Sequence, residues 1–141
     1  MGEKHRLLIV DDNRALVLAA KLILEKNGYE VFVAFDGLEG LEKAQAEKPD
    51  LIILDISMPK MDGYKVCRKL KSDPETAKIS VIILSAKGEI DESITATEVS
   101  LQEVFMGFDF GAHNFLTKPV TANELLEAVK NEFSFSSILN D

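Results

Sequence analysis

The stretch LIILD, at residues 51–55, decides the fold predicted for this chain. Four apolar residues in succession, rather than alternation with polar ones, are typical of a strand that is buried on both faces of a sheet. Similar apolar runs stand at residues 7–10 (LLIV) and 81–84 (VIIL), and a shorter one at 115–116. Each run leads into residues that can do chemistry, and in chain order these are Asp11 and Asp12, Asp55, Ser85, and Lys118.

Segments with helical spacing separate these runs, and we expect strands at 6–10, 31–35, 51–54, 79–84 and 113–116. The positions expected to face the core are Leu16, Ala19, Ala20, Ile23 and Leu24 in the first helix, Leu38, Leu41 and Ala44 in the second, Val66, Cys67 and Leu70 in the third, and Leu125, Leu126, Val129 and Phe133 in the last. Capping boxes at Asp36–Glu39 and Thr121–Glu124 mark two helix starts, and Gly28 suits a helix end.

Strand and helix therefore alternate five times, which predicts one domain of the three-layer α/β/α class with a parallel five-stranded sheet. Ligands of such sheets bind beyond the carboxyl ends of the strands, where the strand order reverses. Because the acidic residues follow the first and third strands, we place the reversal between those two. The predicted strand order is 2-1-3-4-5.

The segment 88–109 does not fit this scheme simply, because it has 22 residues where a crossover helix of about 12 would suffice. A continuous helix of this length would extend about 33 Å, at 1.5 Å per residue. Ser100 and Glu103 form another capping box. We favour a break before Ser100 over one long helix.

Composition narrows the functional classes. The 141 residues carry a net charge of −8, whereas a nucleic-acid surface is basic, so we expect no direct contact with DNA or RNA. The single cysteine, Cys67, excludes an internal disulfide. No apolar stretch approaches the roughly 20 residues of a membrane span, and the start MGEKHR lacks a signal peptide. We expect a cytoplasmic protein without membrane contact.

The strand ends predict a cation site. Asp11, Asp12 and Asp55 would repel one another in a shared pocket unless a cation joined them, and Mg²⁺ prefers oxygen ligands and leaves room for phosphate oxygens. Three carboxylates, one divalent cation and the Lys118 ammonium have no net charge together. Asp55 closes the strand predicted to be central and is our candidate nucleophile toward phosphorus. Lys118 and the Ser85 hydroxyl could balance the added negative charge.

These motifs resemble the receiver domain of two-component response regulators over essentially the whole chain. The residues that carry the resemblance are Asp11-Asp12, Asp55 followed by Met58-Pro59 and Met61-Asp62-Gly63, Ser85-Ala86, and Leu116-Thr117-Lys118-Pro119. The resemblance implies a flavodoxin-like fold with the same 2-1-3-4-5 strand order. It implies a phosphoacceptor switch that has no separate metabolite substrate and dephosphorylates its own Asp55. It also implies a phosphodonor that is a histidine kinase or a histidine phosphotransfer protein.

Residue roles follow from the resemblance as well. Asp12, Asp55 and the backbone carbonyl of Ser57 would bind Mg²⁺ directly, and Asp11 would act mainly through water. Lys118 would contact the phosphoryl group. Ser85 and the aromatic Phe115 would move together as the switch. The surface of the helix before the last strand, of that strand and of the last helix would then control a downstream partner.

One departure from the family pattern is visible. Ser85 and Lys118 are 33 positions apart, about ten more than the common family spacing, and the extra residues lie between Lys87 and Ser100. This insertion adjoins the expected signalling surface, so partner geometry and homodimer formation stay open. The downstream protein is unspecified.

Two other functions stay open at this stage. A haloacid-dehalogenase-like phosphatase would use a similar site, but such enzymes carry a second acid two positions after the nucleophile, where this chain has Ser57. A docking module that signals without phosphate would tolerate loss of pocket residues, and none is missing here. A dinucleotide site is disfavoured, because no glycine-rich fingerprint follows the first strand.

Overall fold

The computed structural model describes residues 4–56, 63–85 and 114–140, without the side chains of Tyr64, Ser85, Asn114, Phe115 and 135–140. Its strands are β1 (Arg6–Val10), β2 (Glu30–Ala34), β3 (Leu51–Asp55), β4 (Ser80–Ser85) and β5 (Asn114–Thr117). Its helices are α1 (Arg14–Lys26), α2 (Gly37–Glu47), α3 (Gly63–Ser72) and α5 (Ala122–Asn140). The alternation of strand and helix predicted from the sequence is confirmed over these residues.

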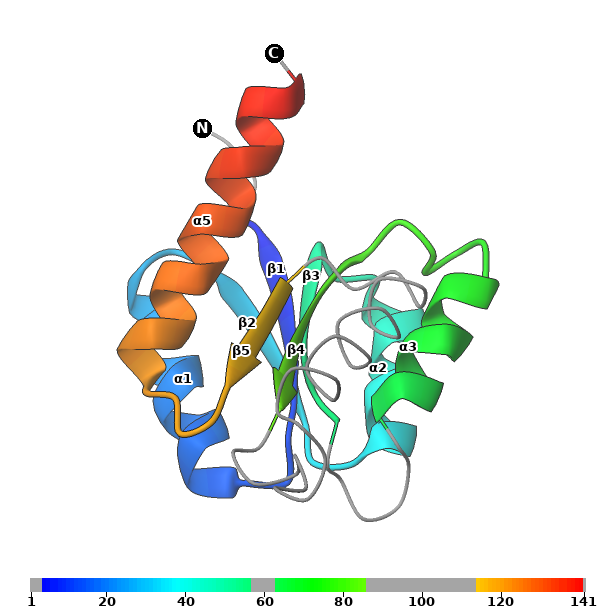
Figure 1. The fold of residues 1–141 in the computed structure, drawn as a ribbon, viewed down its shortest axis with the longest axis horizontal. Coiled ribbons are helices and arrows are strands. Elements are labelled where there is room, and N and C mark those ends of the chain that lie inside the picture. Colours follow the sequence, from blue (N-terminus) through cyan, green and yellow to red (C-terminus); the bar gives the residue numbers. More distant parts are fainter. Residues whose placement is uncertain (1–3, 57–62, 86–113, 141) are drawn as a thin grey trace, which may run out of the picture.

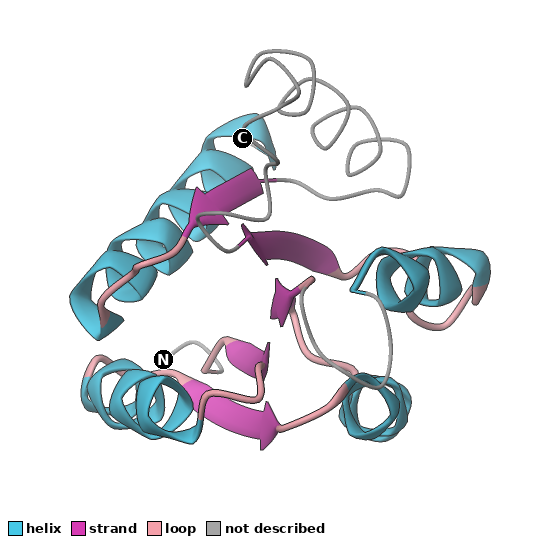
Figure 2. Cartoon of the chain, turned by 60° about the horizontal axis from the view of Figure 1, so that its bottom comes forward, coloured by secondary structure: helices cyan, strands magenta, loops and turns pink. Residues whose placement is uncertain are grey.

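The five strands form one parallel sheet in the order β2-β1-β3-β4-β5, as predicted. Figure 1 shows α1 and α5 on one face of this sheet and α2 and α3 on the other. Figure 2, seen from a different angle, shows the strands lying between these helices. The order reverses between β1 and β3, so the carboxyl ends of these two strands border the crevice in which ligands of this fold class bind.

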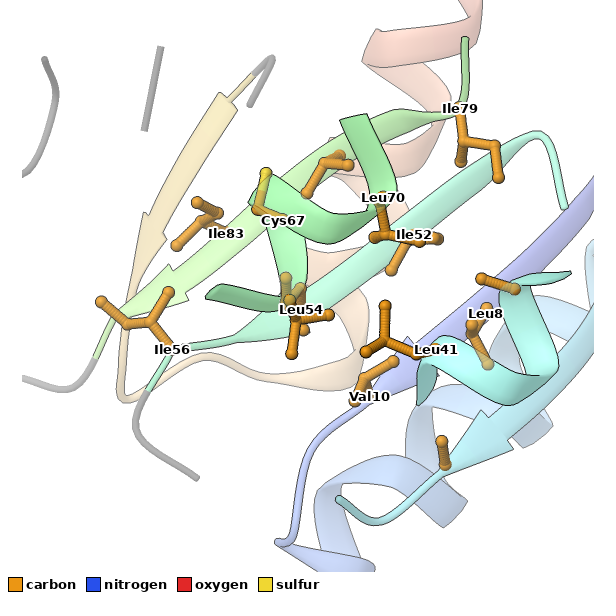
Figure 3. Close-up of a cluster of buried hydrophobic side chains, with 14 residues drawn as sticks. Leu8, Val10, Leu41, Ile52, Leu54, Ile56, Cys67, Leu70, Ile79 and Ile83 are labelled. Atoms are coloured by element: carbon orange, nitrogen blue, oxygen red, sulfur yellow. The ribbon is translucent and has the colours of Figure 1, made fainter. Parts of the chain in front are cut away.

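Alternate residues of the central strands enter two separate cores, because successive side chains point to opposite faces of a sheet. Leu8, Ile52 and Ile83 pack with α2 and α3, where Cys67 and Leu70 are fully or nearly fully buried. Figure 3 shows this cluster. Residues of the opposite parity pack with α1 and α5. Both faces of β1, β3 and β4 are therefore buried, which explains their continuous apolar sequences.

Side-chain caps set three helix starts. Asn13 Oδ1 accepts the amide of Leu16 at 3.2 Å and caps α1. Asp36 caps α2 by accepting the amide of Glu39 at 2.8 Å. At α5, the amide of Glu124 donates to Thr121 Oγ1 at 3.1 Å, and the amide of Thr121 donates to the Glu124 carboxylate at 3.2 Å. The last of these is the predicted capping box in full.

Two expected core positions are wrong. Leu38 is 57% exposed, because α2 approaches the sheet through the buried Gly37 and Gly40, which leaves Leu38 on the outer side. Ala19 of α1 is exposed as well, and Val17 is buried instead. At Gly40 a Cβ atom would lie 2.9 Å from both methyl carbons of Val10, so the close approach of α2 depends on that glycine.

Some of the expected features fall on residues that the structure does not describe. The proposed break and capping box within 88–109, and the insertion between Lys87 and Ser100, lie outside the described residues.

The last helix runs to Asn140 and includes the terminal stretch FSFSSIL, and Figure 1 shows it extending past the sheet. Among the described residues, no helix is long and apolar enough to cross a bilayer.

Candidate functional site

Strand register brings two acidic residues to one level at the reversal of strand order. Val10 of β1 pairs with Leu54 of β3 in the parallel ladder, so the residues that follow them, Asp11 and Asp55, lie beside each other. This is the lower edge of the sheet in Figure 1. Both side chains are buried, Asp11 at 0% and Asp55 at 1% exposure. A buried carboxylate needs a partner, because loss of hydration strongly disfavours its charge.

Asp11 is held in place by its neighbours. Its backbone amide donates to Ala34 O at the end of β2, at 3.1 Å. Its Oδ1 accepts the amide of Asn13 at 3.0 Å. Asn13 also caps α1, so this residue links the helix start to the acid at the end of β1. Sequence reasoning missed Asn13, although an asparagine just before a run with helical spacing is a usual cap signal.

Asp12 completes a group of three acids. One carboxylate oxygen each from Asp11, Asp12 and Asp55 lies within 4.8 Å of the others. Asp12 is exposed, in contrast to the buried Asp11 and Asp55. The three acids that the sequence places after two strands therefore share one site.

Lys118 joins this group from the end of β5. Its Nζ lies 2.8 Å from Asp11 Oδ2 and 3.3 Å from Asp55 Oδ2, and its side chain is 20% exposed. The peptide bond from Lys118 to Pro119 is cis. Residues separated by more than a hundred positions thus meet at one edge of the sheet, with two of the acids bridged by one ammonium.

The electrostatics of the site follow from burial and pairing. Burial raises the pKa of Asp11, the nearby charge of Asp55 adds to the rise, and the Lys118 ammonium and the Asn13 amide partly offset it. Burial alone would lower the pKa of Lys118, but the two carboxylates outweigh it, so this pKa lies above its ordinary value. Lys118 therefore stays charged at neutral pH, whereas burial makes the charged form of Asp11 less favourable than it is in water.

The donor set fits a hard divalent cation. Asp11 Oδ2 is fully buried and receives no well-aligned hydrogen bond within the described part of the chain. Carboxylate oxygens are the ligands that Mg²⁺ prefers. Lys118 supplies one positive charge against the three carboxylates. Two negative charges are left over, and one divalent cation would neutralise them. Asp11, Asp12 and Asp55 are the described residues able to hold such an ion.

Other candidate residues are placed only in part. Ser85 ends β4 in register with Thr117 of β5, so its backbone adjoins the same edge as Lys118, but its side chain is outside the description. The same holds for Phe115, which lies in β5. Ser57, whose carbonyl we expect to face the cation, lies outside the described residues.

Comparison with known proteins supports one family. The model of the response regulator receiver domain matches residues 7–130. Over 125 residues the chain is 41% identical to the DNA-binding dual master transcriptional regulator RpaA of Synechocystis sp. and 36% identical to the alkaline phosphatase synthesis transcriptional regulatory protein PhoP of Bacillus subtilis. Each match covers 89% of this chain and 47% of the relative. The chain therefore spans about half the length of these curated relatives.

Solved structures agree with the family match. A CheY-like receiver domain protein from Methanospirillum hungatei has a TM-score of 0.79 at 30% identity, covering 95% of this chain and 97% of that one. The chemotaxis protein CheY4 of Vibrio cholerae has a TM-score of 0.75 at 27% identity, covering 91% and 98%. Receiver domains are signalling domains of two-component systems rather than metabolic enzymes. From its sequence, its strand order and these matches, the chain belongs to the response regulator receiver domain family.

Proposed function

We propose that this chain is a phosphoacceptor switch in which Asp55 takes a phosphoryl group from a phosphohistidine of a histidine kinase or a histidine phosphotransfer protein. The observation that carries the proposal is the convergence of Asp11, Asp12, Asp55 and Lys118 at the reversal of strand order. Phosphoryl transfer requires mainly positioning and charge stabilisation from a protein. A carboxylate nucleophile beside an ammonium and two further acids could provide both the positioning and the charge stabilisation.

In the proposed reaction an Asp55 carboxylate oxygen forms a bond to phosphorus as the bond from phosphorus to the donor histidine nitrogen breaks. The leaving nitrogen keeps the bonding electron pair. Lys118 Nζ, 3.3 Å from Asp55 Oδ2, is placed to pair with a phosphoryl oxygen. Loss of the phosphoryl group to water would return Asp55 to a carboxylate, and we include this self-dephosphorylation in the proposal.

Asp11, Asp12, Asp55 and the backbone carbonyl of Ser57 would hold Mg²⁺ in this proposal, with Asp11 acting mainly through water. Bound Mg²⁺ would supply positive charge for the phosphoryl oxygens. The residues themselves keep distinct tasks: Asp55 reacts, Lys118 neutralises charge, and Asn13 holds Asp11 in place through its backbone amide.

We further propose that the signal leaves through the face that includes β5 and α5. A pocket of about 400 Å³ lies there, lined by Leu116, Asn123, Glu124, Glu127, Ala128 and Asn131. Lys118 directly follows β5 and contacts Asp55, so a change at Asp55 would be transmitted to this strand. Ser85 and Phe115 would be the residues that move, and an unspecified downstream protein would read the change.

Two of the relatives are named as transcriptional regulators, one of them as DNA-binding. Both are about twice as long as the matched region, and residues 1–141 have a net charge of −8. We propose that these residues do not themselves bind nucleic acid, because an acidic surface repels phosphate backbones.

The test uses acetyl phosphate as a small phosphodonor and intact-mass measurement. Wild-type chain in Mg²⁺ should gain one phosphoryl group, and the gain should disappear with a chelator. Asp55→Asn should gain none. Asp50→Asn is the matched control, since Asp50 is half-exposed and immediately precedes β3, at the opposite end of that strand from Asp55, and it should react like wild type. An unmodified wild-type mass, or equal labelling of Asp55→Asn, would refute the proposal.

A further inference from the structure

The first residue of α3, Gly63, lies against the backbone of the residue proposed to react. A Cβ atom at position 63 would overlap the Ile56 Cα and would lie 2.8 Å from the carbonyl oxygen of Asp55. It would also lie 2.9 Å from Ile56 Cγ2. Two of these three neighbours are backbone atoms, which cannot rotate away as a side chain can.

Backbone hydrogen bonds hold Ile56 against both α3 and β4. The amide of Gly63 donates to Ile56 O at 3.3 Å, and the amide of Ile56 donates to Leu84 O of β4 at 3.1 Å. Asp55 itself is in register with Leu84. The backbone at 55–56 is thus held between β4 on one side and the start of α3 on the other.

We infer that Gly63 is a positioning residue for Asp55, and this inference rests on the proposed phosphoacceptor role of Asp55. Only a residue without a side chain lets α3 begin in contact with the end of β3. That contact fixes the direction of the Asp55 backbone, and with it the distance from the carboxylate to Lys118 and Asp12. Any side chain at position 63 must push α3 or the end of β3 aside.

The first experiment compares Gly63→Ala with Gly28→Ala, each checked for folding by circular dichroism. Gly28 ends α1 with φ of +92°, and its Cβ would meet nothing within 4 Å. Alanine there strains the backbone and lowers stability without touching the site. With acetyl phosphate, Gly63→Ala should react about 100-fold more slowly, as expected for a misplacement of the order of 1 Å. It should also need more Mg²⁺ for its half-maximal rate, whereas Gly28→Ala should match wild type in both.

A folded Gly63→Ala chain with wild-type rate and wild-type Mg²⁺ requirement would overturn the inference, as would equal losses in both variants. If the wild-type chain itself is not phosphorylated, the proposed function fails, which is a separate result.

A second measurement uses only the wild-type chain and does not depend on the folding of a variant. Because coupling between two sites is reciprocal, a contact that positions Asp55 should itself be strengthened when the site is loaded. Hydrogen exchange at the Gly63 amide should slow at least severalfold when Mg²⁺ and acetyl phosphate are added. An unchanged exchange rate in a chain shown to be phosphorylated would overturn the inference.

Discussion

The Lys118 ammonium lies 2.8 Å from Asp11 Oδ2, closer than to the proposed phosphoacceptor at 3.3 Å. In the structure this one ammonium therefore bridges two buried acids, whose charge the proposed divalent cation would also neutralise. The arrangement links metal binding, protonation and stability, because each changes the balance of charge in the same group of side chains.

Lys118→Ala should destabilise the fold and make stability depend on Mg²⁺. Removing one partner of a buried pair leaves an uncompensated charge and costs about 3 kcal/mol. Saturating Mg²⁺ should restore part of this loss. It should stabilise the variant by more than it stabilises wild type, because the variant keeps all three acids but lacks the ammonium that neutralises part of their charge. Urea unfolding with and without Mg²⁺ measures both effects. A Mg²⁺ increment no larger than that of wild type would contradict the account.

Asp11→Asn should stabilise the chain in metal-free buffer at neutral pH, because it removes one of two neighbouring buried carboxylates while Asp55 remains as a partner for the Lys118 ammonium. Burial raises the pKa of Asp11 above its ordinary value of 3.8, so the folded state disfavours its charge more than the unfolded chain does. The gain should therefore shrink as the pH falls through the raised pKa and vanish below 3.8. Urea titrations over that pH range test the sign, and a variant less stable than wild type at neutral pH would refute it.

Stability at high pH should report on Lys118. Its pKa is raised in the fold, so the ammonium contributes stability fully below its ordinary value of 10.5, and loses it as the pH rises through the higher value. The difference in unfolding free energy between wild type and Lys118→Met should be constant from pH 7 to 10 and then narrow. Using the difference cancels other alkaline titrations, such as that of Cys67, whose pKa burial raises to about 11. A difference that widens above pH 10.5 would contradict the assignment.

Leu38 and Leu41 offer a matched pair on α2. Leu41 is 8% exposed and Leu38 is 57% exposed. Leu41→Ala should cost about 2 kcal/mol, through lost burial and a cavity, and Leu38→Ala less than about 0.5 kcal/mol. Thermal or urea unfolding of the two variants measures both losses. Similar losses would mean that Leu38 is as buried as Leu41, and that α2 is therefore rotated about its axis.

Leu38 also shows where sequence reasoning reached its limit. The spacing of Leu38, Leu41 and Ala44 predicts one buried stripe, and two of the three are buried. Gly37 and Gly40 take the remaining contact area, since a helix can approach a sheet most closely where it has no side chain. Periodicity weights a residue by its hydrophobicity, so it cannot recognise a buried surface made of glycine.

The fold itself was largely predictable, because β1, β3 and β4 are buried on both faces and their apolar runs are unambiguous. The convergence of the acids with Lys118 followed from the rule that parallel strands end at one edge. The close contact between Lys118 and Asp11 did not follow, because it depends on register and side-chain reach. The fit of Gly63 against Ile56 was equally hidden, since it is a contact between backbones.

Hydride trapping locates the phosphorylated residue chemically. The wild-type chain, phosphorylated by acetyl phosphate in Mg²⁺, is treated with borohydride, which reduces an aspartyl phosphate to homoserine, and peptide mass spectrometry then locates the product. Homoserine should form at position 55 and nowhere else, and only when Mg²⁺ is present. Homoserine at Asp11 or Asp12, or none in a chain that has gained the mass of a phosphoryl group, would contradict the role of Asp55 as phosphoacceptor.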